Sequence, residues 1–324
     1  MYRIFVLKAR FCNELRPITR SKNGLNSACQ GLAFSRHVRH ASIKIQVMSD
    51  LHLELCKKNY LDFSIPRKAP YLLLAGDIGL FTQLDKYLQF LRHQCSLFSH
   101  VYLILGNHEF YGLSRRGVFN RVSELLDDPE LRGSLSVLDR GRVDLSRTVT
   151  LLGCTLHSHI PREAHNAVKE RVGDFRRIKN WKIGDHNREH FTDVTWLRTE
   201  IESISTEEPR RCIIIATHHA PSRKGTTHPK HRGKAGISAF CTDLLESQVQ
   251  SWQGIENVKY WVFGHTHMST EFDSETIRVV ANQRGYVHPT RHKSRRTVPR
   301  LFELPKGAVR FDKQKCIVIN EGVQ

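Results

Sequence analysis

Five short polar motifs combine the residue types that bind divalent cations, and they lie at strand-to-loop boundaries. They are Asp50-Leu51-His52, Gly76-Asp77, Gly106-Asn107-His108-Glu109, Thr217-His218-His219 and Gly264-His265-Thr266-His267. Carboxylate oxygen, amide oxygen and imidazole nitrogen bind the cations that polarise phosphate, whereas softer sites require thiolates. Together the motifs predict a dinuclear metal site.

The spacing within the motifs supports this interpretation. Asp50 and His52 are two residues apart, so in an extended segment both side chains point to the same side, and His265 and His267 repeat this spacing. Asp77 stands alone after a glycine. A carboxylate can bridge two cations with its two oxygens, which makes Asp77 the natural bridging ligand.

Apolar runs rich in β-forming residues come before the motifs. They cover residues 43–48, 71–75, 101–105, 212–216 and 258–263. These runs predict buried strands. A ligand just past the end of a buried strand is rigidly held at the open edge where α/β sheets bind their ligands. The flanking glycines Gly76, Gly106 and Gly264 permit tight turns that a side chain could obstruct.

Further elements are predicted between the motifs. Periodic apolar residues indicate helices over 82–98, 114–126 and 193–204, and 134–138, 142–145 and 149–154 are short strand candidates in an antiparallel part of the sheet. Residues 160–208 form a long charged insertion, expected to pack as a cap through Trp181, Phe191 and Trp196. A basic loop at 221–236 follows the fourth motif.

Composition sets broad limits on the function. The 324 residues, 40% of them hydrophobic, can form a full core, and no run approaches the roughly 18 to 20 apolar residues of a transmembrane helix. A formal charge of +18 favours anionic partners such as phosphorylated substrates or nucleic acid. The eight cysteines are dispersed, which fits small core residues in a reducing compartment better than a disulfide framework.

The composition also predicts three segments. Residues 1–42 form a basic extension with Glu14 as their only acid, the folded part is expected to begin at Ile43, and residues 286–324 form a basic C-terminal segment. A basic, nearly acid-free segment that contains serine is typical of mitochondrial transit peptides, and an unstructured extension is the alternative. The expected location is intracellular, in the cytoplasm, with the mitochondrion as the second possibility.

The set of five motifs resembles that of the calcineurin-like metallophosphoesterases, and the resemblance covers roughly residues 43–285. The resemblance implies a two-sheet αββα sandwich with the metals at the strand ends. It also implies the ligand sets: Asp50, His52, Asp77 and His267 for one metal, and Asp77, Asn107, His218 and His265 for the other. Mixed oxygen and nitrogen ligation is compatible with manganese, iron or zinc.

Two departures from the family pattern narrow the subgroup. Phosphoprotein phosphatases of the family continue Gly-Asp with x-Val-Asp-Arg-Gly and have His-Gly in the first motif, but this chain has Gly76-Asp77-Ile78-Gly79 and His52-Leu53. The chain looks more like the small Ser/Thr phosphatase-like phosphoesterases, including its segment 282–286. Protein dephosphorylation is therefore the weaker interpretation.

The expected chemistry is hydrolysis. Two cations would lower the pKa of a shared water and generate a hydroxide for attack on phosphorus. His108 has no metal in the family pattern and is placed to donate a proton to the leaving alkoxide, with a buried structural imidazole as the alternative. His219 could replace His218 as a ligand. Arg284 could contact a substrate phosphate or serve in a structural ion pair.

These features predict a metal-dependent phosphoesterase that acts on a small phosphorylated substrate, either a phosphomonoester or a phosphodiester. The positive charge leaves a nuclease as an alternative, although aromatic residues for base stacking are sparse in the 221–236 loop. A non-catalytic scaffold on the same fold is the third hypothesis. It is disfavoured because degenerate members would be expected to have lost ligands, and this chain keeps the full set.

Overall fold

Apolar runs form the central strands of two β-sheets in the computed structural model. The structure describes residues 42–55, 59–231, 233–234, 236–287, 304–305 and 307–321. The predicted basic extension 1–42 lies outside these residues, apart from Ser42, and so does the arginine-rich stretch 288–303 of the C-terminal segment.

The first sheet has five strands in the order β11-β1-β2-β3-β4, and the second has six in the order β5-β6-β7-β8-β10-β9. The first contains β1 (Ser42–Met48), β2 (Tyr71–Ala75), β3 (His100–Ile104), β4 (Leu135–Leu138) and β11 (Cys316–Asn320). The second contains β5 (Gly141–Asp144), β6 (Val149–Cys154), β7 (Cys212–Thr217), β8 (Val258–Phe263), β9 (Thr270–Ser274) and β10 (Ile277–Ala281). The strands β1 to β4 run parallel, as do β6, β7, β8 and β10.

The central strands are rich in apolar residues because both of their faces are largely buried. In β2, Leu72 and Leu74 point outward to a core under helices, whereas Leu73 points inward to a core between the two sheets. In β7, Ile214 faces the core between the sheets and Ile215 faces the outer helical layer. Because side chains alternate along a strand, each central strand contributes residues to two cores.

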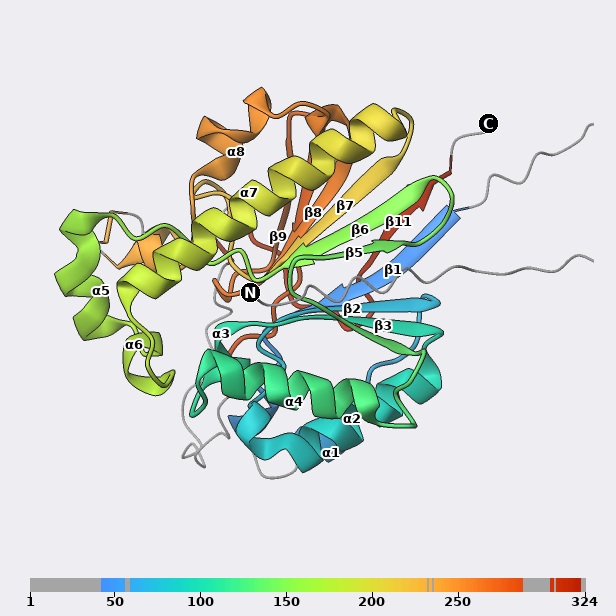
Figure 1. Cartoon of the computed structure of the whole chain (residues 1–324), viewed down its shortest axis with the longest axis horizontal. Coiled ribbons are helices and arrows are strands. Elements are labelled where there is room, and N and C mark those ends of the chain that lie inside the picture. The colour runs from blue at the N-terminus through green and yellow to red at the C-terminus, as the bar shows by residue number, and fades with distance from the viewer. Residues whose placement is uncertain are drawn as a thin grey trace, which may run out of the picture.

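Helices cover both outer faces. The α-helices are α1 (Asn59–Asp62), α2 (Leu84–Leu97), α3 (Asn107–Phe110), α4 (Arg115–Asp127), α5 (His165–Arg171), α6 (Asp174–Arg177), α7 (Ile183–Glu207) and α8 (Leu244–Ser247). Short 3-10 helices are η1 (Leu53–Leu55), η2 (Phe81–Gln83), η3 (Arg162–Ala164), η4 (Pro229–His231), η5 (Ile237–Ala239), η6 (Val249–Ser251) and η7 (Ile255–Asn257). In Figure 1, α1, α2 and α4 lie along the first sheet and α7 and α8 along the second. In the described part of the chain, no helix is long and apolar enough to span a membrane.

This arrangement is the predicted αββα sandwich, so the expected fold class is confirmed. The antiparallel region is smaller than expected, because only β5 and β6 of the three short candidates pair antiparallel, while β4 joins the first sheet parallel to β3. The strand β11 pairs antiparallel with β1, so the first sheet includes residues beyond 285.

The insertion is more helical than the sequence suggested. The helix α7 runs for 25 residues, well beyond the predicted 193–204, and packs Leu197, Ile201 and Ile204 into the outer core of the second sheet. Trp181 and Trp196 pack against the two outer cores as expected. Phe191 does not, since its side chain is 57% exposed.

Candidate metal centre

Seven polar side chains from different loops meet at one end of the two sheets. The loop after β1 carries Asp50 and His52, and the loop after β2 carries Asp77. The remaining members follow β3, β7 and β8: Asn107, His218, His265 and His267. The carboxyl ends of parallel strands share an edge, so residues far apart in sequence come together there. The structure thus brings together all seven predicted ligands.

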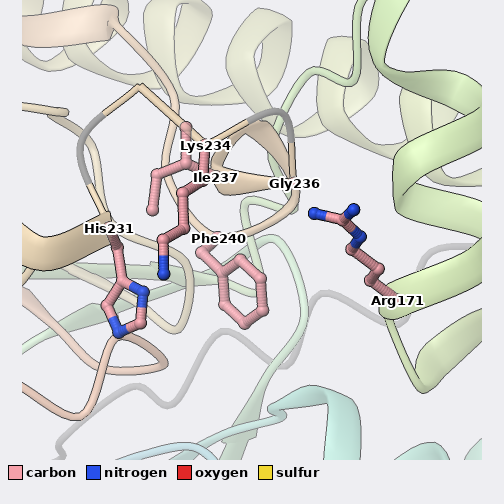
Figure 2. Close-up of a pocket in the computed structure, with 6 residues that line it drawn as sticks. All are labelled: Arg171, His231, Lys234, Gly236, Ile237 and Phe240. Atoms are coloured by element: carbon pink, nitrogen blue, oxygen red, sulfur yellow. The ribbon is translucent and has the colours of Figure 1, made fainter.

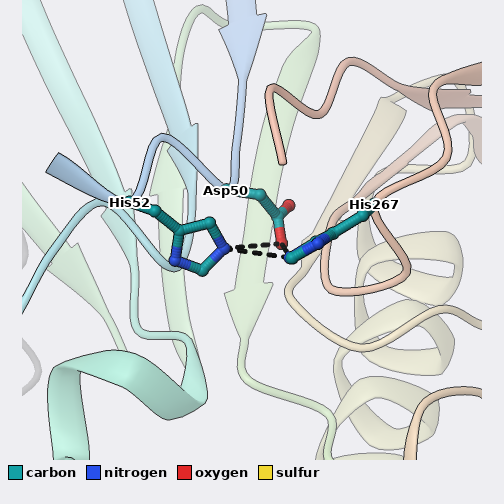
Figure 3. A group of neighbouring side chains, drawn as sticks. All are labelled: Asp50, His52 and His267. Atoms are coloured by element: carbon teal, nitrogen blue, oxygen red, sulfur yellow. Dashed lines mark hydrogen bonds and ion pairs between the residues drawn. The ribbon is translucent and has the colours of Figure 1, made fainter. Parts of the chain in front are cut away.

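The first group of donors consists of Asp50, His52 and His267 (Figure 3). The Nε2 atom of His267 lies 3.4 Å from Oδ1 of Asp50 and 2.9 Å from Nε2 of His52. The Nε2 atom of His52 lies 4.0 Å from Oδ1 of Asp50. Two imidazole nitrogens and a carboxylate oxygen therefore face a common point, as ligands of one cation would.

The second group consists of Asp77, His218 and His265, whose donor atoms lie within 4.8 Å of one another. Asn107 joins it, since its Oδ1 lies 3.1 Å from Nε2 of His218. Asp77 faces both groups: its Oδ1 lies 3.3 Å from His218 Nε2 and its Oδ2 lies 3.9 Å from His52 Nε2. This placement suits a carboxylate shared between two cations.

His218 belongs to the cluster and His219 points elsewhere. The Nδ1 atom of His219 lies 3.0 Å from the Ser158 hydroxyl, and its ring packs against the His265 ring with 4.1 Å between ring centres. Its Nε2 atom is buried and has no hydrogen-bond partner among the described residues. The geometry therefore favours His218 as the ligand candidate.

The centre buries negative charge. Asp50 and Asp77 are 0% and 1% exposed. Burial raises the pKa of Asp77, but the charges of His108 and His218 outweigh it and hold the pKa well below its ordinary value. Conversely, Asp77 raises the pKa of His218 to about 10 against the effect of burial. Buried carboxylates require compensating positive charge, and this donor set fits divalent cations in that role.

Five of the seven predicted ligands have a left-handed backbone conformation. Asp50, His52, Asp77, His265 and His267 have φ values of 52°, 46°, 54°, 72° and 54°. Residues other than glycine avoid this left-handed region, at a cost of about 1 kcal/mol or more each, so such strain persists where the surroundings enforce it and often marks a functional site.

The flanking glycines are required for two different reasons. Gly76 has a φ of +86°, so it makes a turn that favours glycine. Gly106 and Gly264 are required by close approach. A Cβ atom on Gly106 would lie 2.3 Å from Oδ1 of Asp77, and one on Gly264 would lie 2.7 Å from Oδ2 of Asp50. A Cβ atom on Gly76 would also lie 2.4 Å from Nδ1 of His218, so a side chain would be obstructed at all three positions, as predicted, and only Gly76 has a left-handed φ as well.

Glu109 stabilises the loop that carries Asp77 through hydrogen bonds to its backbone. The sequence did not reveal this role. Its fully buried carboxylate accepts hydrogen bonds from the backbone N–H groups of Asp77 (3.0 Å), Ile78 (2.8 Å) and Gly106 (2.8 Å) and from the Tyr87 hydroxyl (3.0 Å). Burial and the nearby Asp77 raise the pKa of Glu109 to about 7. One side chain thus connects the second and third motifs.

Asp174 of α6 orients Asn107, which sequence reasoning also missed. Its Oδ1 atom accepts from Asn107 Nδ2 at 2.9 Å and from the Tyr111 hydroxyl at 2.6 Å. The amide nitrogen of Asn107 is therefore held toward Asp174, and its oxygen faces His218. The insertion between the third and fourth motifs thus contributes directly to the geometry of the centre.

Replacing Asp174 with Ala is expected to weaken one cation site about 10- to 100-fold, as loss of a side chain that orients a ligand typically does. The Asn107 amide keeps only the Tyr111 hydroxyl as an acceptor, and that hydroxyl also loses its own partner Asp174, so the amide can turn its oxygen away. Competition with a fluorescent chelator measures both affinities. Glu170→Ala, an exposed carboxylate on α5, serves as the control. Unchanged affinities in the Asp174 variant would exclude this orienting role.

His108 lies between Glu54 and Tyr286 beside the predicted ligands. Its Nδ1 atom lies 2.7 Å from Glu54 Oε1, and its Nε2 atom lies 3.2 Å from the Tyr286 hydroxyl and 3.8 Å from Oδ2 of Asp77. Burial lowers the pKa of His108, but Asp77 and Glu54 outweigh it and leave the pKa above its ordinary value. The arrangement favours a protonated imidazole.

Arg284, which the sequence suggested as a phosphate contact, lies against the segment that carries Asp50 and His52. Its Nη1 atom donates to the backbone carbonyl of Leu51 at 2.8 Å, and its guanidinium lies over the Phe63 ring at 4.7 Å. These contacts show how Arg284 supports the segment that carries Asp50 and His52. They favour the structural alternative over direct recognition of the substrate.

Known proteins resemble this chain in sequence or in fold. A family model described as calcineurin-like phosphoesterase matches residues 43–269. The uncharacterized protein L509 of Acanthamoeba polyphaga mimivirus is 27% identical over 270 residues, which cover 75% of this chain and 91% of that protein. The crystal structure of the phosphopantetheinyl hydrolase PptH from Mycobacterium tuberculosis aligns with a TM-score of 0.57 at 17% identity, over 76% of this chain and 91% of that one. At 17% identity, the likeness to PptH concerns the fold alone.

Proposed function

Because the chain belongs to the calcineurin-like phosphoesterase family, we propose that it hydrolyses a phosphomonoester or phosphodiester at a centre of two cations. The observation that carries the proposal is the position of Asp77. Its two oxygens face two separate groups of donor atoms, at 3.3 Å from His218 Nε2 and 3.9 Å from His52 Nε2. A single cation site would not need such a shared carboxylate.

In this proposal one cation is held by Asp50, His52, Asp77 and His267, and the other by Asp77, Asn107, His218 and His265. Cations bound there would polarise phosphoryl oxygens and a water molecule and offset the charge that grows during displacement. Manganese, iron and zinc all suit the oxygen and nitrogen donors. A small phosphorylated molecule is the proposed substrate class.

His108 is the proposed proton donor to the leaving oxygen. Its Nδ1 atom is engaged by Glu54, which leaves Nε2 as the atom nearest the Asp77 carboxylate and the Tyr286 hydroxyl. A proton held on Nε2 is therefore on the side of the donor clusters, where the phosphate ester would bind. General acid catalysis of this kind typically contributes about 10²- to 10⁴-fold to the rate.

Replacing Glu54 with Gln is expected to lower kcat about 10- to 100-fold, because His108 loses the charge that orients its ring and favours its protonated form. Glu54 also lies 3.3 Å from Nδ1 of His52, so metal content is measured alongside the rate. Glu124→Gln, an exposed carboxylate of α4, is the control. Wild-type kcat in the Glu54 variant would exclude this role.

The experiment that tests the proposed function uses two model esters. Protein loaded separately with manganese, iron or zinc is assayed with p-nitrophenyl phosphate and bis(p-nitrophenyl) phosphate. We expect metal-dependent release of p-nitrophenolate from at least one ester, and the ratio of the two rates ranks monoester against diester hydrolysis. Absence of hydrolysis of both esters with every metal would count against the phosphoesterase proposal.

A further inference from the structure

A small pocket lies beside the candidate metal centre, between α5 and the loop that carries η4 and η5 (Figure 2). Its volume is roughly 120 Å³. It is lined by Arg171, His231, Lys234, Gly236, Ile237 and Phe240. In Figure 2, Lys234 and His231 lie on one side of the Phe240 ring and Arg171 on the other, with its guanidinium group turned toward the loop.

The pocket is positively charged, and none of its described lining residues is acidic. Arg171 and Lys234 are exposed, and within the described ranges neither side chain forms an ion pair. Burial lowers the pKa of His231, and the positive charges of Lys234 and Lys230 lower it further. No carboxylate contributes to that shift, so the surroundings of His231 are positive. Uncompensated basic groups around a concave site favour an anionic ligand.

Phe240 places this pocket next to the candidate metal centre. Its ring stacks on that of His265, with 4.9 Å between ring centres and 22° between ring planes. The neighbouring Ala239 carbonyl lies 3.4 Å from Nε2 of His265. A single aromatic ring thus separates the basic pocket from a predicted ligand of the second cation. A phosphate in the pocket would thus contact the ring that stacks on this ligand.

We propose that this pocket binds a second phosphate group of the substrate, so that the preferred substrates are small molecules with two phosphates. The proposal rests on the proposed function. Pockets that enclose whole drug-sized ligands are typically about 300–1,000 Å³, so this pocket suits a single anionic group. Arg171 and Lys234 supply charged donors to the phosphate oxygens, and the His231 imidazole can supply a further N–H.

Binding of inorganic phosphate to metal-depleted protein tests the pocket without requiring catalysis. The metal-free centre carries His108 and His218, whose pKa values are raised, as well as Asp50 and Asp77, but it is identical in all three proteins compared and so does not affect the comparison. Calorimetry compares the wild type with the double variant Arg171→Ala/Lys234→Ala and with Lys169→Ala/Lys224→Ala, two exposed lysines outside the lining. We expect Kd to rise at least about fivefold in the first variant and to stay unchanged in the second. Equal Kd values in all three proteins would overturn the proposal, even if the protein is an active phosphoesterase.

Kinetics test the same site with a matched pair of substrates, fructose 6-phosphate and fructose 1,6-bisphosphate. For the metal-loaded wild type, kcat/KM is expected to be at least about tenfold higher for the bisphosphate, mainly through KM. This exceeds the factor of about two expected from a second cleavable phosphate. The ratio should fall toward two in the Arg171/Lys234 variant and remain high in the lysine control.

A polymeric substrate would give a different result. If the two substitutions weaken binding of a single-stranded oligonucleotide but leave phosphate binding and the fructose ratio unchanged, the basic groups contact a nucleic acid backbone. That outcome would overturn the proposal of a small substrate with two phosphates.

Discussion

Replacing Asp77 with Asn is expected to reduce the bound metal from two cations per chain to one or none and to lower kcat/KM about 10³-fold or more. An amide has one oxygen and a poorly coordinating nitrogen, so it cannot serve both donor groups. Stabilisation by a cation is worth several kcal/mol, and each ~1.4 kcal/mol is a factor of ten in rate. Plasma mass spectrometry and p-nitrophenyl phosphate hydrolysis measure the two effects.

The control for Asp77→Asn is Asp85→Asn, which makes the same chemical change at an exposed position of α2. It should retain wild-type metal content and rate. Circular dichroism checks that the Asp77 variant is folded, since Asp77 also accepts a hydrogen bond from the His108 backbone N–H at 2.8 Å. A folded variant with two cations and a near wild-type rate would refute the shared-ligand assignment.

Replacing His108 with Asn is expected to retain both cations and to lower kcat about 10²- to 10⁴-fold for esters with a poor leaving group. The loss should depend on the leaving group. An alkoxide needs a proton as the bond to phosphorus breaks, whereas p-nitrophenolate leaves readily without one. Hydrolysis of an alkyl phosphate is therefore expected to fall much more than hydrolysis of p-nitrophenyl phosphate.

His93→Asn, an exposed change on α2, is the matched control and should behave as the wild type with both esters. The comparison separates proton donation from a structural role. A damaged site would slow both esters equally, and such a result would assign His108 to structure. Near wild-type turnover of both esters would exclude the proton-donor role entirely.

The central strands could be predicted because they carry a strong signal, whereas their arrangement as a two-sheet sandwich was implied by the family resemblance. The strands β2, β3 and β7 are buried on both faces over most of their length, as are the last residues of β1 and β8, so each reads as a mostly apolar run that stops at a polar motif. By contrast, β11 is a short edge strand whose pairing with β1 joins distant parts of the chain. The pattern of apolar residues along a segment can indicate a strand but does not show which strand it pairs with. The pairing of β11 with β1 was therefore not predictable.

The same contrast applies to the site. The seven predicted ligands stand out because polar residues follow apolar strands, but the residues that orient them do not. Asp174 lies in a charged insertion with many other acids, and only the fold reveals its contact with Asn107. Glu54 and Glu109 were inside or beside recognised motifs. Their roles became clear only once the structure placed His108 and the Asp77 loop against them.

The metal content of the purified protein, measured together with its hydrolytic activity, tests the central claim most directly. The protein is depleted with a chelator, reloaded with manganese, iron or zinc, and analysed by plasma mass spectrometry before assay with both nitrophenyl esters. We expect two cations per chain with at least one of these metals, and activity that is lost on depletion and recovered on reloading. A folded protein that binds no cation and cleaves neither ester would contradict the account and favour a non-catalytic scaffold.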